Sequence, residues 1–279
     1  MLLKRYLTAT DYLKENQQYL EEEEVINSLI LGLAIANKGA EKDLSLYLDI
    51  RSNAEIQFTA IKTVGRNLLI YGKPETLPIY APILIDFLAQ DNIDPPGING
   101  LKELVLMLSP YFQKQLKWNC KVEFEQLTYE LTSVRFNPSF QGKMEKGSLR
   151  QLSKYTKWMQ NFYEQALYPI TEKEAAIIVH NKIRDGELYI WHTDTAVSMT
   201  CIARPTSNGI TINYVYTPLE YRQNGYATKL VAELSSLMLR NGYRFCTLFT
   251  DLNNPTSNNI YKKIGYLPIA EFKSVKFIK

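Results

Sequence analysis

A strand, a short loop and a helix follow one another directly over residues 210–238, and this stretch constrains the fold more than any other. The strand is the β-branched and aromatic run Ile210–Tyr216, and Pro218 ends it. Backbone N–H groups and the positive end of a helix dipole meet at such a helix start, so the loop predicts a phosphate site, which Gly225 lets the backbone approach closely. The apolar residues of the helix fall on one face: Ala227, Leu230, Val231, Leu234, Leu237 and Met238.

Two segments resemble motifs of a known family. Arg222–Ala227 resembles the R/Q-x-x-G-x-G/A pyrophosphate loop of the GNAT superfamily, the acyl-CoA-dependent N-acyltransferases. Asn254–Tyr266 resembles a later motif of that family: an asparagine, a small residue three positions on, a tyrosine seven positions on, then glycine and an aromatic residue. The motifs have the family's order and spacing, and the resemblance is clear for roughly residues 140–279.

The resemblance implies an α/β (α+β) fold, in which helices flank a mixed, mostly antiparallel sheet. A chain of 279 residues with 46% hydrophobic content can build two cores. The first 130 residues follow the order helix, strands, helix, helix, strand, which resembles a second GNAT unit; an unrelated α+β domain is the alternative. We expect two tandem GNAT-like domains, residues 1–135 and 142–279, joined by the Pro- and Gly-containing linker Phe136–Gly142.

The first half is expected to lack a CoA site. Its segment Tyr71–Thr76, where a phosphate loop would stand, places Pro74 where N–H donors are needed. Its acidic run Glu21–Glu24 favours a solvated helix face over a metal or partner site. Periodicity predicts a helix over 11–37, strands over 44–50, 56–63 and 67–71, helices over 78–89 and 101–112, and a strand over 121–131.

The second half is expected to begin with a strand at Gly147–Ser153 that enters a helix. Ser153 can cap this helix and Pro169 stops it, while Thr171 caps a second helix that ends near Gly186. Strands are expected over 187–192 and 196–203. In GNAT proteins much of the acceptor pocket lies between these two helices. Four aromatic residues could line it, although a core role is the commoner one: Tyr155, Trp158, Phe162 and Tyr163.

The resemblance implies one acetyl-CoA site. Backbone N–H groups of the loop would bind the pyrophosphate, and the end of the preceding strand, splayed from its neighbour, would offer unpaired backbone groups to the pantetheine. In the family the residue that matches Asn258 contacts CoA, whereas Asn254 also suits a purely structural N-cap. The expected cofactor-binding residues are Val215, Tyr216, Thr217, Arg222, Gln223, Asn224, Gly225, Tyr226, Ala227, Thr228, Asn254 and Asn258.

Tyr261 is the expected catalytic residue. It follows Asn258 by three positions on the same helix side, and the matching tyrosine of the family stands beside the CoA sulfur as thiolate anchor or general acid. A core tyrosine is the alternative. The general base stays open among Glu220, Asp251 and a water, and an amine that arrives neutral would need none.

Composition limits which classes of partner and which cellular compartment are expected for this chain. A net charge of +3 gives no argument for nucleic acid. No metal is expected, because the cysteines are separated in apolar surroundings and neither histidine has a ligand spacing. Neither a signal peptide nor a run long enough to span a membrane is found, so we expect a cytoplasmic protein. The oligomeric state stays open.

The expected function is that of an N-acetyltransferase, which transfers an acetyl group from acetyl-CoA to a primary amine of a small molecule or peptide by direct attack. The alternative is a non-catalytic CoA-binding or regulatory module on a tandem GNAT scaffold. The intact loop together with Tyr261 favours the enzyme. Nothing in the sequence identifies the acceptor.

Overall fold

The structure is a computed structural model, and it describes residues 1–40, 43–136 and 142–279. The described chain divides into two compact units, Met1–Thr128 with Ile269–Lys279, and Tyr129–Pro268. The last strand thus completes the first unit, whereas the expected domains put it in the second. Those domains, 1–135 and 142–279, stay a prediction, and most of the predicted linker, residues 137–141, lies outside the described residues.

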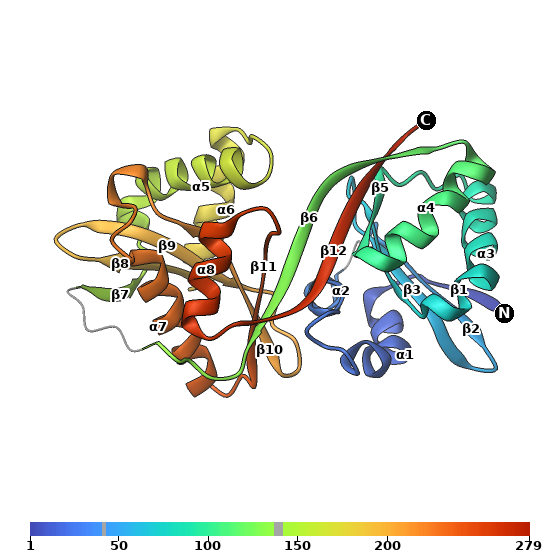
Figure 1. Ribbon diagram of the computed structural model, residues 1–279, viewed down its shortest axis with the longest axis horizontal. Coiled ribbons are helices and arrows are strands. Elements are labelled where there is room, and N and C mark those ends of the chain that lie inside the picture. Colours follow the sequence, from blue (N-terminus) through green and yellow to red (C-terminus); the bar gives the residue numbers. More distant parts are fainter. Residues whose placement is uncertain (41–42, 137–141) are drawn as a thin grey trace. The chain divides into compact units, whose positions relative to one another are not determined.

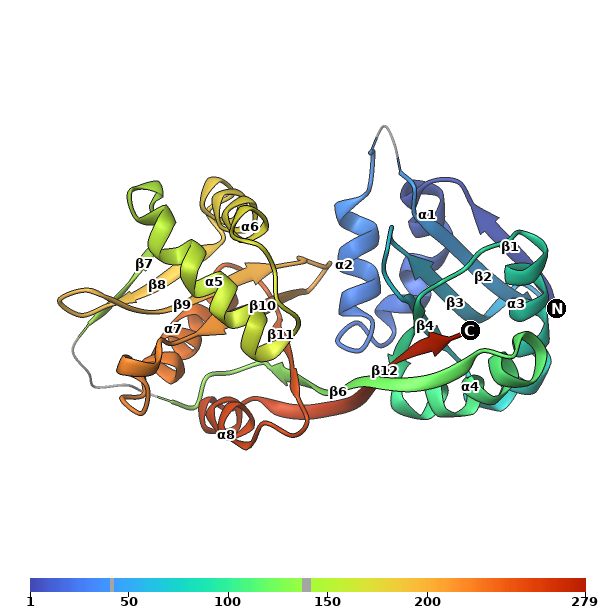
Figure 2. The same cartoon turned by 90° about the horizontal axis from the view of Figure 1, so that it is seen from above.

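The first unit is a mixed sheet with helices on both faces (Figures 1 and 2). Its strands follow the order β1-β2-β3-β4-β5-β12-β6, in which β4 and β5 are parallel and β12 is antiparallel to β5. Its elements are β1 (Leu2–Tyr6), α1 (Ala9–Glu21), α2 (Ser28–Ala36), β2 (Leu46–Ser52), β3 (Glu55–Lys62), β4 (Leu68–Gly72), η1 (Pro74–Thr76), α3 (Leu77–Gln90), β5 (Gly97–Leu101), α4 (Lys102–Leu116), β6 (Asn119–Leu131) and β12 (Leu267–Ile278).

Strand β2 is buried on both faces, because successive side chains point to opposite sides of a sheet. Leu46, Leu48 and Ile50 join the core under α3 and α4, and Tyr47 joins the core under α1 and α2. Alternate side chains of this strand therefore enter two different cores, one on each face of the sheet, and neither face is turned to water.

Three features of the first unit differ from the prediction. The helix expected over 11–37 is interrupted at residues 22–27, where the buried Asn27 side chain donates to the backbone carbonyl of Leu20. The acidic run lies mainly in this turn and not on a helix face. Glu22 and Glu23 are exposed, as expected of a solvated run, whereas Glu24 is buried.

Strands β1 and β5 were also missed. In β5 the glycines weaken the strand signal, but close approach of neighbouring strands requires them. A Cβ at Gly97 would lie 1.9 Å from the carbonyl oxygen of Val275, and one at Gly100 would lie 2.6 Å from the Ile70 backbone.

The second unit has a sheet in the order β11-β10-β9-β8-β7, with α5 and α6 on one face and α7 on the other (Figure 2). Aromatic and apolar side chains of α5 and α6 pack on β8 and β9. Its elements are β7 (Lys143–Lys146), η2 (Leu149–Gln151), α5 (Leu152–Ala166), α6 (Glu172–Arg184), β8 (Leu188–His192), β9 (Ala196–Ala203), β10 (Gly209–Tyr216), η3 (Leu219–Tyr221), α7 (Tyr226–Arg240), β11 (Phe245–Asp251) and α8 (Pro255–Ile264). The α/β (α+β) class with a mostly antiparallel sheet is confirmed.

Of the helix N-caps expected in this unit, the one at Thr171 is confirmed and the one at Ser153 is wrong. Thr171 forms a capping box with Glu174: its hydroxyl accepts from the Glu174 N–H, and its own N–H donates to the Glu174 carboxylate at 2.8 Å. Ser153 does not cap, because α5 begins one residue earlier, after the turn that Ser148 caps. The strand expected at 147–153 was wrong: strand β7 ends at Lys146, and η2 and the start of α5 occupy residues 149–153.

The described segments, residues 1–40, 43–136 and 142–279, can be searched for membrane spans and for metal-ligand clusters. There, no helix combines the length and apolar character that a bilayer crossing requires. No three or more His, Cys, Asp or Glu side chains gather there in an arrangement that could hold a metal ion. The three cysteines are free thiols, and Cys201 and Cys246 are buried.

Candidate functional site

Strands β10 and β11 open into a fork. They pair in parallel only where Gly209–Thr211 meets Phe245–Thr247, although β10 continues to Tyr216 and β11 to Asp251. Because both strands run in the same direction, the loop after β10 and helix α8 after β11 start at the same sheet edge. Ligands of open α/β sheets bind outside this carboxyl edge.

A β-bulge shapes the first arm of the fork. The register of β10 against β9 shifts between Asn213 and Tyr216, and Tyr214 has a φ of 52°. Hydroxyls of β9 replace the lost ladder bonds: Ser198 donates to the Tyr216 carbonyl at 3.1 Å, and Thr200 to that of Asn213 at 3.0 Å. A bulge leaves backbone unpaired and re-aims side chains, so residues 214 and 215 lie outside the regular ladder.

The loop between β10 and α7 leaves the helix start uncapped. Gln223 and Gly225 have φ values of 64° and 72°, and Gly225 is the N-cap residue without a side chain to cap. The Asn224 side chain stabilises the loop by donating to the carbonyls of Tyr221 and Arg222.

Donors therefore converge on open space in front of α7. Within the described part of the chain, no acceptor is bound by the backbone N–H groups of residues 223–228; the first helical bond runs from the Lys229 N–H to the Gly225 carbonyl. A Cβ built on Gly225 meets no atom within 4 Å. Free donors at a positive helix end form an anion site.

The Arg222 side chain braces this loop. Its Nε donates to the Thr217 carbonyl at 2.9 Å, and its Nη2 donates to Gln165 Oε1 on α5 at 2.6 Å. The guanidinium also lies 5.9 Å from the centre of the Tyr216 ring. Arg222, expected to bind the cofactor, thus links the loop to α5 in this structure.

Aromatic residues of α5 meet the bulged strand. The hydroxyls of Tyr163 and Tyr214 lie 3.1 Å apart, and the Phe162 ring meets Tyr214 edge to face at 5.4 Å. Of the four candidates for the acceptor side, Tyr155, Trp158 and Tyr163 are core residues, 1%, 6% and 8% exposed, and Phe162 is partly buried against the same core. The bulge brings Tyr214 to this cluster, and no sequence signal had indicated it.

Helix α8 carries the second set of expected site residues. Asn254 is its N-cap and accepts from the Ser257 N–H at 3.1 Å, as its sequence position predicted. The Asn258 side chain points into the protein, 8% exposed, and its amide is engaged by backbone carbonyls and by the Tyr129 hydroxyl. Sequence reasoning missed Tyr129, which stands near the end of β6.

Tyr261 lies one turn after Asn258 and is 7% exposed. Its ring contacts those of Tyr129 and Tyr266, with centroids 6.1 and 5.9 Å away. Its hydroxyl makes no hydrogen bond to any described residue, and burial, with a smaller effect of Tyr129, raises its pKa far above the usual value. The phenol is therefore a neutral donor at physiological pH.

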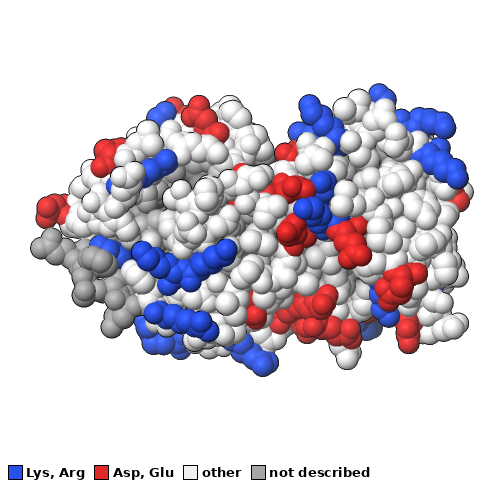
Figure 3. All heavy atoms as spheres, viewed as in Figure 1, with Lys and Arg blue, Asp and Glu red and all other residues white. Residues whose placement is uncertain are grey.

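Both base candidates are exposed. Glu220 lies in η3, and the Asp251 carboxylate accepts from the Asn253 N–H at 2.8 Å at the end of β11. Basic side chains gather over α7 and α8 on the face shown in Figure 3. Arg240 lies in the last turn of α7, and Lys262 and Lys263 lie in the last turn of α8.

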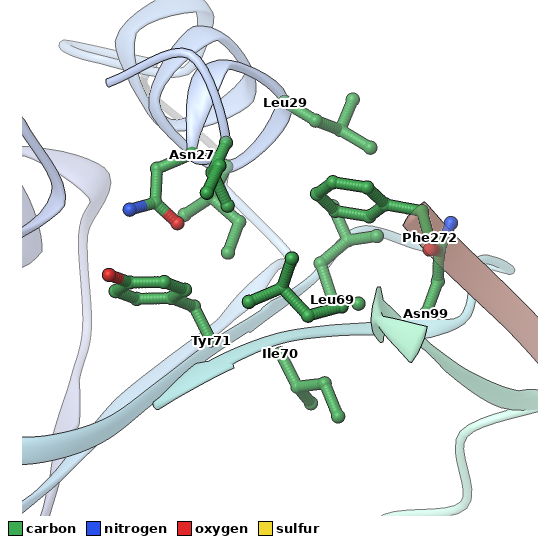
Figure 4. Close-up of a pocket in the computed structure, with 11 residues that line it drawn as sticks. Asn27, Leu29, Leu69, Ile70, Tyr71, Asn99 and Phe272 are labelled. Carbon is green, nitrogen blue, oxygen red and sulfur yellow. The ribbon is translucent and has the colours of Figure 1, made fainter. Parts of the chain in front are cut away.

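Among the described residues of the first unit, no comparable fork is found. Its parallel strands β4 and β5 pair from Leu68 to Ile70, which spans most of these short strands. A cavity of about 10 Å³ lies there between α2 and the sheet, lined by Asn27, Leu29, Tyr71 and Phe272 among others (Figure 4). That volume accommodates about one water molecule.

Residues 152–266 match the model of the acetyltransferase (GNAT) family. This segment belongs to the GNAT acetyltransferase family. The match contains the fork, the loop and α8, and the fold supports an acyl-CoA-dependent N-acetyltransferase in general. A search of curated proteins finds no match.

Solved GNAT structures resemble the chain over nearly its whole length. A GNAT-family acetyltransferase from Colwellia psychrerythraea has 15% identity and a TM-score of 0.59, covering 99% of each chain. A GCN5-related N-acetyltransferase from Sphaerobacter thermophilus has 12% identity and a TM-score of 0.64, covering 98% of this chain and 94% of its own. A tandem GNAT protein from the clavulanic acid biosynthesis pathway has 10% identity and a TM-score of 0.55, covering 99% and 98%. The expected tandem GNAT fold is thus confirmed.

Proposed function

We propose that the second unit transfers an acetyl group from acetyl-CoA to a primary amine of a small molecule or peptide by direct attack. The observation that most supports this proposal is the uncapped start of α7, which lies beside the fork of β10 and β11. The N–H groups of residues 223–228 would bind the pyrophosphate, and the unpaired backbone at Val215 would meet the pantetheine.

In this reaction the amine nitrogen attacks the thioester carbonyl, the C–N bond forms, and the C–S bond breaks. The sulfur then leaves with the electron pair, and a donor close to it lowers the barrier. The amine proton passes to water or to a carboxylate, and the thiolate takes its proton from water, so the step gives an amide and the CoA thiol. Tyr261 fits this role, because its buried hydroxyl stays protonated and has no partner among the described residues. A raised pKa favours a hydrogen bond to the thiolate over full transfer of the phenolic proton.

The test is CoA-thiol release with a panel of primary amines, measured for the wild type and for Tyr261→Phe. We expect kcat of the variant to fall about 10- to 1,000-fold, with unchanged affinity for CoA. Wild-type turnover in Tyr261→Phe would remove Tyr261 from the mechanism. A protein that binds CoA and releases no thiol with any amine would instead be a CoA-binding module.

A further inference from the structure

The Asn258 side chain connects three parts of the second unit. Its Oδ1 accepts from the Tyr129 hydroxyl at 3.1 Å. Its Nδ2 donates to the backbone carbonyl of Asp251, the last residue of β11, at 3.1 Å and to that of Leu252, the next residue, at 3.4 Å. It also donates to the carbonyl of Asn254 at 2.8 Å. Since both amide hydrogens are engaged, this residue is a bridge within the protein.

Tyr129, near the end of β6, is the side-chain partner of Asn258 in this bridge. It is fully buried and lies 129 residues before its partner Asn258 in the chain. Its ring also packs on that of Tyr261 at 6.1 Å. Tyr129 therefore contacts α8 twice, at Asn258 through its hydroxyl and at Tyr261 through its ring.

We propose that Tyr129 and Asn258 are positioning residues. They hold α8 against strand β11 of the fork, so that the Tyr261 hydroxyl reaches the leaving sulfur. The inference rests on the proposed function of the second unit. Residues three apart share one side of a helix, so a shift of Asn258 moves Tyr261 with it. A misplacement of about 1 Å can lower a rate about 100-fold.

Tyr266 provides a matched control. It is 1% exposed, its ring lies 5.9 Å from that of Tyr261, and its hydroxyl pairs with Ser235 on α7 at 2.8 Å. Tyr266→Phe thus removes one buried hydrogen bond beside Tyr261 and leaves the tether between Asn258 and β11 intact.

The experiment is a double-mutant cycle in the full chain. Tyr129→Phe and Tyr266→Phe are each made in the wild type and in Tyr261→Phe, and kcat for thiol release, Kd for CoA and Tm are measured. In the wild type, Tyr129→Phe should lower kcat about 5- to 100-fold with CoA affinity unchanged. In the Tyr261→Phe background it should change kcat less than about twofold, because the two residues act as a unit. Tyr266→Phe should lower Tm and keep kcat.

Three results would overturn the proposal: wild-type kcat in Tyr129→Phe, the same loss of kcat in both backgrounds, or an equal loss in Tyr266→Phe. The second would reveal a general structural role. Wild-type turnover in Tyr261→Phe also overturns it, since no hydroxyl would then need positioning. These outcomes all require an active wild type, so they differ from a failure of the proposed function, in which no amine supports thiol release.

Discussion

Replacing Gly225 tests the phosphate loop, and Gly65 offers the matched control. Their φ values are 72° and 70°, and a Cβ built on either glycine meets no atom within 4 Å. Gly225→Val and Gly65→Val should therefore introduce similar backbone strain, about 1–2 kcal/mol, without a clash in the free protein. Gly65 lies between β3 and β4 of the first unit.

CoA affinity should separate the two variants. In Gly225→Val the branched side chain would stand at the start of α7, in front of the free N–H groups of residues 223–228. Loss of one hydrogen bond to a charged phosphate costs about 1.5–3 kcal/mol. That loss corresponds to a roughly 10- to 150-fold weaker Kd for CoA. Gly65→Val should leave the Kd unchanged.

The assay is isothermal titration with CoA, combined with Tm from circular dichroism on the same preparations. The strain should lower Tm by about 2–8 °C in either variant. The assignment of the loop is refuted if Gly225→Val binds CoA as tightly as the wild type. An equal loss of affinity in Gly65→Val would attribute the effect to strain alone.

Three further predictions concern stoichiometry, capping and pH. Titration of the full chain should give one CoA per chain, and a second site would contradict a degenerate first unit. Thr171→Ala should lower the free energy of unfolding by about 1 kcal/mol, measured by urea denaturation, whereas Ser153→Ala should cause no such loss, because Ser153 lies inside α5 and caps nothing. Burial raises the pKa of the Cys201 and Cys246 thiols to about 12. Since unfolded thiols lose their protons near pH 8.5, these groups stabilise the fold fully below that pH, and this contribution should fall as pH rises toward 12; a urea midpoint independent of pH from 7 to 11 would contradict it.

Features set by short sequence separations were predictable. The capping box of Thr171 involves residues three apart, and the Asn254 cap likewise reaches only Ser257. The loop at Gly225 is equally local, because a strand, a glycine and an apolar helix face follow directly in the chain. Such signals depend little on the rest of the fold.

Features set by contacts between distant residues were not predictable. The end of α1 depends on Asn27 reaching back to Leu20 from beyond the helix, and the bridge at Asn258 depends on Tyr129, which no motif singled out. The bulge at Tyr214 has no sequence signal, since tyrosine rarely adopts a positive φ. Tertiary packing decides all three.

Each unit connects two parallel strands through a helix: β4 to β5 through η1 and α3, and β10 to β11 through η3 and α7. We call these connections the crossovers, and they differ in the backbone N–H groups that they leave without an acceptor. In the first unit, the N–H groups of Lys73, Thr76 and Leu77 already donate to backbone carbonyls, and Pro74 and Pro78 have none. In the second unit, the corresponding N–H groups at the start of α7 have no acceptor among the described residues.

The strands on either side of these crossovers differ in the same sense. In the first unit β4 and β5 stay paired over most of their length, and the cavity beside them accommodates about one water (Figure 4). A pantetheine chain entering there would have to break main-chain hydrogen bonds, whereas the fork between β10 and β11 is already open beyond Thr211. Each broken, unreplaced bond in a buried sheet costs about 1–3 kcal/mol. The backbone therefore favours a single CoA site, in the second unit, even though both units connect two parallel strands through a helix.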